Sequence, residues 1–151
     1  MKVAFASCAK VQDFSAQAAW DEIRARRPDA LLVLGDKVYL DRDDHVDAQD
    51  LGAELRTSYQ RQFAQPQFGA LQVDLHSRGG RQFAVYDNHD FLGDKRCGGD
   101  AEPGLCTAAR AEFVRSFAPS APSVPPCPDP GPEGYGLHQL ALVDLLLLEL
   151  R

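Results

Sequence analysis

The stretch Ala30-Leu31-Leu32-Val33-Leu34-Gly35-Asp36 decides the fold that we predict for this chain. A run of consecutive apolar residues that ends at Gly-Asp is typical of a short strand buried in a parallel sheet. A similar run, Lys2–Ser7, precedes it, and a helical pattern over Ser15–Arg26, with Ser15 as the predicted N-cap, lies between the two. Strand, helix and strand in this order predict a βαβ unit, whose parallel strands are expected to be buried on both faces.

Further helices and strands are predicted beyond this unit. Their expected ranges are a helix over Leu51–Phe63, a strand over Gln82–Tyr86, a helix over Thr107–Phe117 and a fourth strand over Leu140–Leu150. Residues 118–134 hold seven of the ten prolines and are predicted to form an irregular surface loop. The expected fold class is therefore α/β, with a mostly parallel sheet flanked by helices.

The composition excludes several classes of protein. The chain has 151 residues, of which 44% are hydrophobic and 25% are charged, as in a globular domain rather than a disordered or collagenous one. No apolar run approaches the roughly 20 residues of a membrane helix, and the N-terminus does not resemble a signal peptide, so we expect a cytoplasmic protein with no membrane partner. The net charge of −6 argues against nucleic acid as a structural partner, because that binding relies on lysine and arginine.

The negative charge is concentrated in one segment. From Asp36 to Glu54 there are seven acids and two bases, which gives 2 − 7 = −5 of the total of −6. We expect six of these acids to face solvent. The four cysteines include no CxxC pair, which argues against a zinc ribbon. Cys97 and Cys106 flank a glycine-rich loop, where a disulfide is one alternative and two reduced thiols the other.

Polar residues that can bind metal ions follow each of the first three predicted strands. Cys8 follows the first strand, Asp36 and Tyr39 follow the second, and Asp87-Asn88-His89-Asp90 follows the third. Because ligands of open α/β sheets bind outside the carboxyl ends of the strands, we expect these side chains to converge. Thiolate, carboxylate, phenol, amide and imidazole groups together favour iron or zinc beside an oxygen-coordinated ion.

Each of these residues also has a simpler interpretation. Cys8 taken alone is more often a small buried apolar side chain. Asp36 after Gly35 can serve as a turn residue, and Asn88-His89 can close a loop. The metal site is favoured because these residues occur together at strand ends.

The ordered set of motifs resembles alkaline phosphatase D-type (PhoD-like) phosphatases of the calcineurin-like metallophosphatase superfamily. Ser7-Cys8 stands where that family has a strand ending in SC, and Gly35–Tyr39 resembles its LGDxxY pattern. Tyr86–Asp90 resembles its (W)DDH[DE] pattern, with Tyr86 in place of Trp and Asn88 in place of Asp. Val143–Arg151 resembles its strand ending in LDTR. The resemblance spans nearly the whole chain and implies the first half of a four-layer αββα fold.

The resemblance also implies a set of site residues. Cys8 and Tyr39 would bind Fe³⁺, and Asp36 would bridge the iron and a second ion, Ca²⁺ in the best match, although other divalent metals would serve. Asn88 would bind the second ion, with Asp87 as a further ligand. His89 would act beside the phosphate as general acid or as stabiliser of the leaving group, so that His89 and Asp36 are the implied catalytic residues.

The function implied is metal-dependent hydrolysis of phosphate monoesters or diesters. The family's remaining ligands lie beyond its LDTR strand, so we expect residues 1–151 to form a single incomplete metallophosphatase domain, with little activity as an isolated chain. Its expected partners are a phosphate ester and either a missing C-terminal half or a second copy that covers the sheet edge. Many relatives are secreted or periplasmic. The alternatives are a non-catalytic α/β binding or assembly module that retains relic motif residues, and a metallohydrolase built differently.

Overall fold

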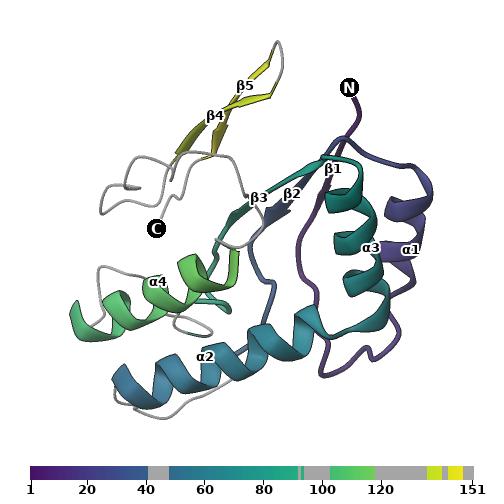
Figure 1. The fold of residues 1–151 in the computed structure, drawn as a ribbon. Coiled ribbons are helices and arrows are strands. Elements are labelled where there is room, and N and C mark those ends of the chain that lie inside the picture. The colour runs from purple at the N-terminus through teal and green to yellow at the C-terminus, as the bar shows by residue number, and fades with distance from the viewer. Residues whose placement is uncertain (41–47, 92, 94–102, 118–135, 141–142, 148–151) are drawn as a thin grey trace.

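The computed structural model describes residues 1–40, 48–91, 93, 103–117, 136–140 and 143–147. These residues have an α/β fold, as predicted (Figure 1). Its main sheet has three parallel strands in the order β1-β2-β3, namely β1 (Val3–Ala6), β2 (Ala30–Leu34) and β3 (Arg81–Val85). The described helices are α1 (Ala18–Ala25), α2 (Ala48–Phe63), α3 (Pro66–Ser77) and α4 (Pro103–Phe117).

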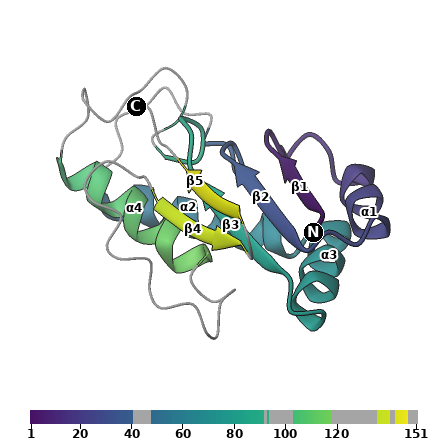
Figure 2. The same ribbon diagram turned by 90° about the horizontal axis from the view of Figure 1, so that it is seen from above.

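One face of the parallel sheet is covered by α1 and α3, which lie side by side (Figures 1 and 2). Trp20 of α1 packs against Phe68 of α3, with ring centroids 5.0 Å apart. Alternate residues of the central strand, Leu31 and Val33, point into this layer, because successive side chains of a strand face opposite sides of a sheet. The first core cluster consists of Ala9, Trp20, Leu31, Val33, Phe68, Leu71 and Leu75.

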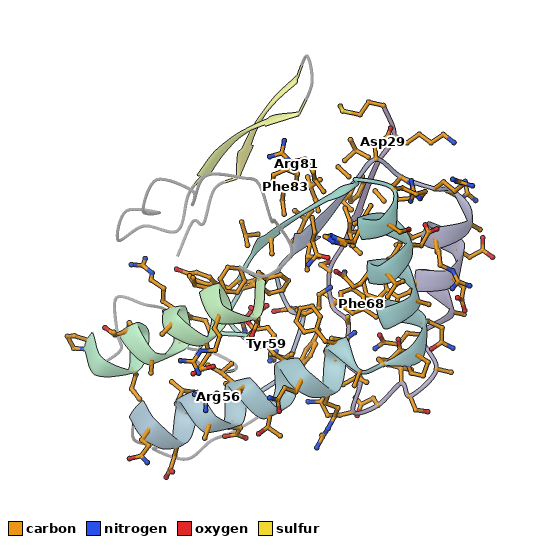
Figure 3. All side chains as sticks on the ribbon, in the orientation of Figure 1. Asp29, Arg56, Tyr59, Phe68, Arg81 and Phe83 are labelled. Atoms are coloured by element: carbon orange, nitrogen blue, oxygen red, sulfur yellow. The ribbon has the colours of Figure 1, made fainter. Side chains whose placement is uncertain are left out.

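The opposite face of the sheet is only partly covered. Leu32 and Phe83 are buried there, and the guanidinium of Arg81 lies over the ring of Phe83, on the side facing away from α3 (Figure 3). In contrast, Phe5 is 72% exposed and Leu34 is 41% exposed. The prediction that the strands are buried on both faces is therefore correct for most of β2 and wrong for β1.

Helices α2 and α4 pack against each other below the carboxyl ends of the strands in Figure 1. The second core cluster between them consists of Val38, Leu40, Leu51, Leu55, Tyr59 and Ala109. Arg56 of α2 and Glu112 of α4 form a two-pronged ion pair, with Nη2–Oε1 and Nε–Oε2 distances of 2.6 and 3.2 Å. Val38 and Leu40 follow β2 directly, so this cluster supports the loop that carries Asp36.

Helix α3 is absent from the sequence-based prediction. Its start has a recognisable signature, because Gln65 accepts a hydrogen bond from the Phe68 N–H at 2.7 Å and Pro66 occupies the first turn. Leu71 and Leu75 then follow Phe68 at helical spacing and are buried. The short Pro-containing segment after α2 thus begins a second helix rather than a loop.

Two further predictions are wrong in detail. Helix α1 begins at Ala18 with Gln17 at its N-cap, so Ser15 is not the cap residue. The predicted fourth strand, Leu140–Leu150, is interrupted: β4 (Gly136–Leu140) and β5 (Val143–Leu147) pair as a separate antiparallel hairpin. A continuous apolar run does not reveal where a chain reverses direction, which explains the error.

Some predictions lie outside the described residues. These are the proline-rich loop at 118–134, most of the acidic segment after Tyr39, and Cys97, and with it the alternative of a disulfide to Cys106. The LDTR-like end of the chain at residues 148–151 also lies outside them. Within the described part of the chain, none of the helices has the length and apolar character needed to cross a membrane.

Candidate functional site

The three loops that follow β1, β2 and β3 are joined by hydrogen bonds. The Ala9 N–H donates to the carbonyl of Asp36 at 2.9 Å, which joins the first loop to the second. The Leu40 N–H donates to the carbonyl of His89 at 3.1 Å, which joins the second loop to the third. The expectation that these strand ends converge is therefore confirmed for the backbone. We call Cys8, Asp36, Tyr39, Asp87, Asn88 and His89 the strand-end cluster.

The side chains of Cys8 and Asp36, which follow different strands, contact each other. The Cys8 thiol lies 3.7 Å from Asp36 Oδ2. Both residues have positive φ angles, 58° for Cys8 and 50° for Asp36, in the left-handed region that few residues other than glycine adopt. Such strain is most often found at functional sites, where the surrounding structure maintains it. Cys8 is exposed, which argues against its interpretation as a small buried apolar residue.

The second carboxylate oxygen of Asp36 provides a test of whether a cation fits here. Asp36 Oδ1 is buried and has no hydrogen-bond partner. A buried carboxylate oxygen without a partner is costly, and a bound cation is one means of satisfying it. A thiolate beside a carboxylate is also a reasonable donor pair for iron or zinc. The Cys8–Asp36 pair therefore fits a metal ion on both counts.

Asp87 lies against the turn that precedes Asp36. Gly35 has φ of +84°, and a Cβ atom on it would lie 2.5 Å from Asp87 Cβ. Glycine is thus required at position 35, because any side chain would push the third loop away from the second. The Asp87 carboxylate accepts a hydrogen bond from the Asn88 N–H at 2.8 Å. The Asn88 carbonyl accepts from the Gly93 N–H at 2.8 Å, so Asn88 also closes its loop, in agreement with its simpler interpretation.

Tyr39 and His89 pack together at the side of the cluster. Their ring centroids are 4.4 Å apart with an interplanar angle of 34°. The Lys10 ammonium lies 5.3 Å from the centroid of the Tyr39 ring and 3.2 Å from a carboxylate oxygen of Asp13. Lys10 was not predicted as a site residue. Its position two residues after Cys8, in a loop that follows a strand, is the signal that could have identified it.

Two ionisable groups lie fully buried directly behind the cluster. Burial raises the pKa of Asp90 to about 7; the nearby negative charges of Asp36 and Asp87 add to this rise, and two backbone N–H donors oppose it. Burial lowers the pKa of Lys37 to about 7, and the Asp90 charge only partly offsets that effect. The Lys37 ammonium has no hydrogen-bond partner and lies 4.6 Å and 4.3 Å from the ring centroids of Trp20 and Phe68.

The described residues contain no group of three or more His, Cys, Asp or Glu side chains that could hold a metal ion. The hydrogen bonds explain part of this result. Both oxygens of Asp90 accept backbone N–H groups, and an oxygen of Asp87 does the same. The Cys8 thiol and the Asp36 carboxylate approach each other directly, and Asp87 lies against the turn that precedes Asp36. The ring of Tyr39 lies against His89.

Three comparisons with known proteins were made. A scan against protein-family models, a search of curated proteins and a search of solved structures each found no match.

Proposed function

We propose that this chain carries part of the active site of a metal-dependent phosphoric ester hydrolase that acts on phosphate monoesters or diesters. The observation that carries this proposal is the pairing of Cys8 with Asp36, in which Asp36 Oδ1 is buried and unpartnered. The positions of Asp87 and of the Tyr39–His89 pair next to it lend support. The PhoD-like resemblance of the sequence motifs supplies the type of reaction.

In this proposal the metal ligands of the strand-end cluster serve two ions. Cys8, Asp36 and Tyr39 would hold Fe³⁺. Asp36, Asp87 and Asn88 would hold the second ion, which would be Ca²⁺ or another divalent metal. When bound, such ions neutralise charge on the phosphate oxygens and lower the pKa of a bound water.

The remaining residues act on the substrate. His89 donates a proton to the leaving oxygen, which is the ordinary role of an imidazole that acts as general acid. The His89 ring packs against the ring of Tyr39. Lys10 places a positive charge beside the cluster, where it attracts the phosphate group.

Metal analysis combined with hydrolysis assays tests the proposal. The chain is incubated with Fe³⁺ and Ca²⁺, freed of excess metal, and assayed with p-nitrophenyl phosphate and bis-p-nitrophenyl phosphate. Because the chain carries only part of the active site, we expect the wild type to retain metal and to turn over at least one of the substrates slowly. We expect Asp36→Asn to lose both properties. Asp21→Asn is the matched control, because Asp21 pairs with Arg24 on the surface of α1. A folded wild type that retains no metal would refute the proposal.

A non-catalytic binding or assembly module is the second candidate. The exposure of Phe5 and Leu34 on the sheet favours it, because parallel sheets are normally covered on both faces. The small number of converging acidic ligands among the described residues also favours it. In that case the wild type would be folded but would show neither metal retention nor turnover.

A further inference from the structure

The carboxylate of Asp90 connects the two loops that carry most of the strand-end cluster. Its Oδ2 atom accepts the N–H of Lys37 at 3.1 Å, across 53 residues of sequence. Its Oδ1 atom accepts the N–H of Asp87 at 2.5 Å. We call these two hydrogen bonds the Asp90 bridge. One end of the bridge adjoins Asp36 and the other end is Asp87, so the bridge spans two predicted ligands.

The residue that forms the bridge is itself fixed in the core. Asp90 is 0% exposed, and its carbonyl accepts a hydrogen bond from the Tyr59 hydroxyl at 3.2 Å. Tyr59 is buried in the second core cluster and projects from α2 towards the strand ends (Figure 3). A fully buried carboxylate is rare in proteins unless partners hold it, and here backbone N–H groups provide those partners. The Tyr59 hydroxyl thus ties the backbone of Asp90 to α2.

We propose that Asp90 is a positioning residue, which holds Asp36 and Asp87 at a fixed separation by accepting the N–H groups of Lys37 and Asp87. The proposal rests on the proposed function, because that function requires Asp36 and Asp87 to lie at a fixed separation. The two hydrogen bonds of the Asp90 bridge are a feature of the fold in either case. We assign Asp90 no contact with metal or substrate, because its side chain is fully buried and each of its oxygens accepts a backbone N–H group. The bridge maintains the approach of Gly35 to Asp87, and with it the alignment of the second and third loops.

Asp90→Asn is the most direct test, because it retains the size of the side chain and changes one acceptor. The amide nitrogen of asparagine cannot accept a hydrogen bond, so one of the two N–H groups loses its partner. Leu75→Ala is the matched control, since Leu75 is buried in the first core cluster, away from these loops. Tyr59→Phe is a milder variant, which removes only the hydrogen bond to the Asp90 carbonyl.

Two measurements on the full chain at one pH separate positioning from general stability. Amide hydrogen exchange reports protection at Lys37 and Asp87, relative to Leu32 in the central strand. Titration with ferric ion alone reports the affinity of the site. In Asp90→Asn we expect exchange at Lys37 or Asp87 to rise about tenfold more than at Leu32, and the affinity for ferric ion to fall about tenfold. In Leu75→Ala, exchange at Lys37, Asp87 and Leu32 should rise by the same factor. The folded variant should keep the wild-type affinity for ferric ion.

The possible outcomes are distinguishable. Wild-type protection of both amides in Asp90→Asn, or wild-type affinity for ferric ion once they are deprotected, would overturn the positioning role. If Asp90→Asn does not fold, Tyr59→Phe decides: a selective rise in exchange at Lys37 and Asp87 with weaker ferric binding supports the role, and unchanged values overturn it. If the wild type binds no ferric ion, the proposed function fails, and a selective exchange effect still supports the bridge as a feature of the fold.

Discussion

Replacement of Lys37 by methionine is expected to raise the free energy of unfolding at neutral pH. The Lys37 ammonium is buried between the rings of Trp20 and Phe68 and has no hydrogen-bond partner. Methionine retains the length and apolar character of the side chain, and its sulfur also packs favourably on aromatic rings. The backbone N–H of residue 37 remains available to Asp90.

The magnitude follows from the pKa of Lys37. The pKa of Lys37 falls from 10.5 in the unfolded chain to about 7 in the folded chain. This fall lowers the free energy of unfolding by about 5 kcal/mol at pH 7 and below. The substitution also removes the attraction between the ammonium and the two rings. That loss cancels about 2 kcal/mol of the stability gained by removing the buried charge. We therefore expect Lys37→Met to be more stable than the wild type by about 3 kcal/mol at pH 7.

The pH dependence gives a second signature of the same effect. Between pH 7 and 10.5 the unfolded chain binds more protons at Lys37 than the folded chain does, so wild-type stability gains from this residue as the pH rises. The Lys37→Met variant lacks this gain.

Urea unfolding at pH 7 and pH 9.5, followed by circular dichroism, measures both quantities. Lys2→Met is the control, because Lys2 is exposed and its replacement should change stability by less than about 0.5 kcal/mol. A Lys37→Met variant that is less stable than the wild type at pH 7, or that shows the same gain between the two pH values, would refute the reasoning.

Three further predictions concern the fold. Gly35→Ala should lower the free energy of unfolding by more than about 2 kcal/mol, because φ is positive and the added Cβ meets the third loop. Gly79→Ala, also at positive φ but with open space around it, should lower it by about 1 kcal/mol. Equal losses of stability in urea unfolding would contradict the close approach of Gly35 to Asp87. Glu112→Gln should cost about 1–2 kcal/mol at pH 7, because the hydrogen bond from Arg56 lowers the pKa of Glu112. That stabilisation is present above the ordinary pKa of 4.5 and is lost as the pH falls through the lower folded value. The difference in stability between the variant and the wild type should therefore shrink as the pH is lowered below 4.5. Phe5→Ser should change the melting temperature little, because Phe5 is 72% exposed, and a large drop would show that this face is covered.

The local sequence predicts the parallel sheet well. The apolar run Ala30–Leu34 coincides with β2. The predicted ends of the strands before and after it differ from the ends of β1 and β3 by one residue. Continuous apolar runs carry this information because a central parallel strand is buried on both faces. The convergence of Cys8, Asp36 and Asp87 also follows from sequence, since it requires only parallel strands with polar residues at their carboxyl ends.

Other features depend on contacts that no local pattern contains. The Asp90 bridge joins residues 53 positions apart, so its acceptor role is visible only in three dimensions. The exposure of Phe5 depends on which layers cover the sheet, and the apolar character of β1 does not reveal it. Helix α3 differs, because its start is marked in the local sequence by Gln65 at the N-cap and Pro66 in the first turn.

Spectroscopic titration with ferric ion tests most directly whether the strand ends form a metal centre. We expect a visible tyrosinate-to-iron absorption band in the wild type, which disappears in Tyr39→Phe. The band should persist in the matched variant Tyr86→Phe, because the Tyr86 ring is stacked on Phe91 and is not a proposed ligand. A wild type without the band, or a band that survives in Tyr39→Phe, would contradict the account.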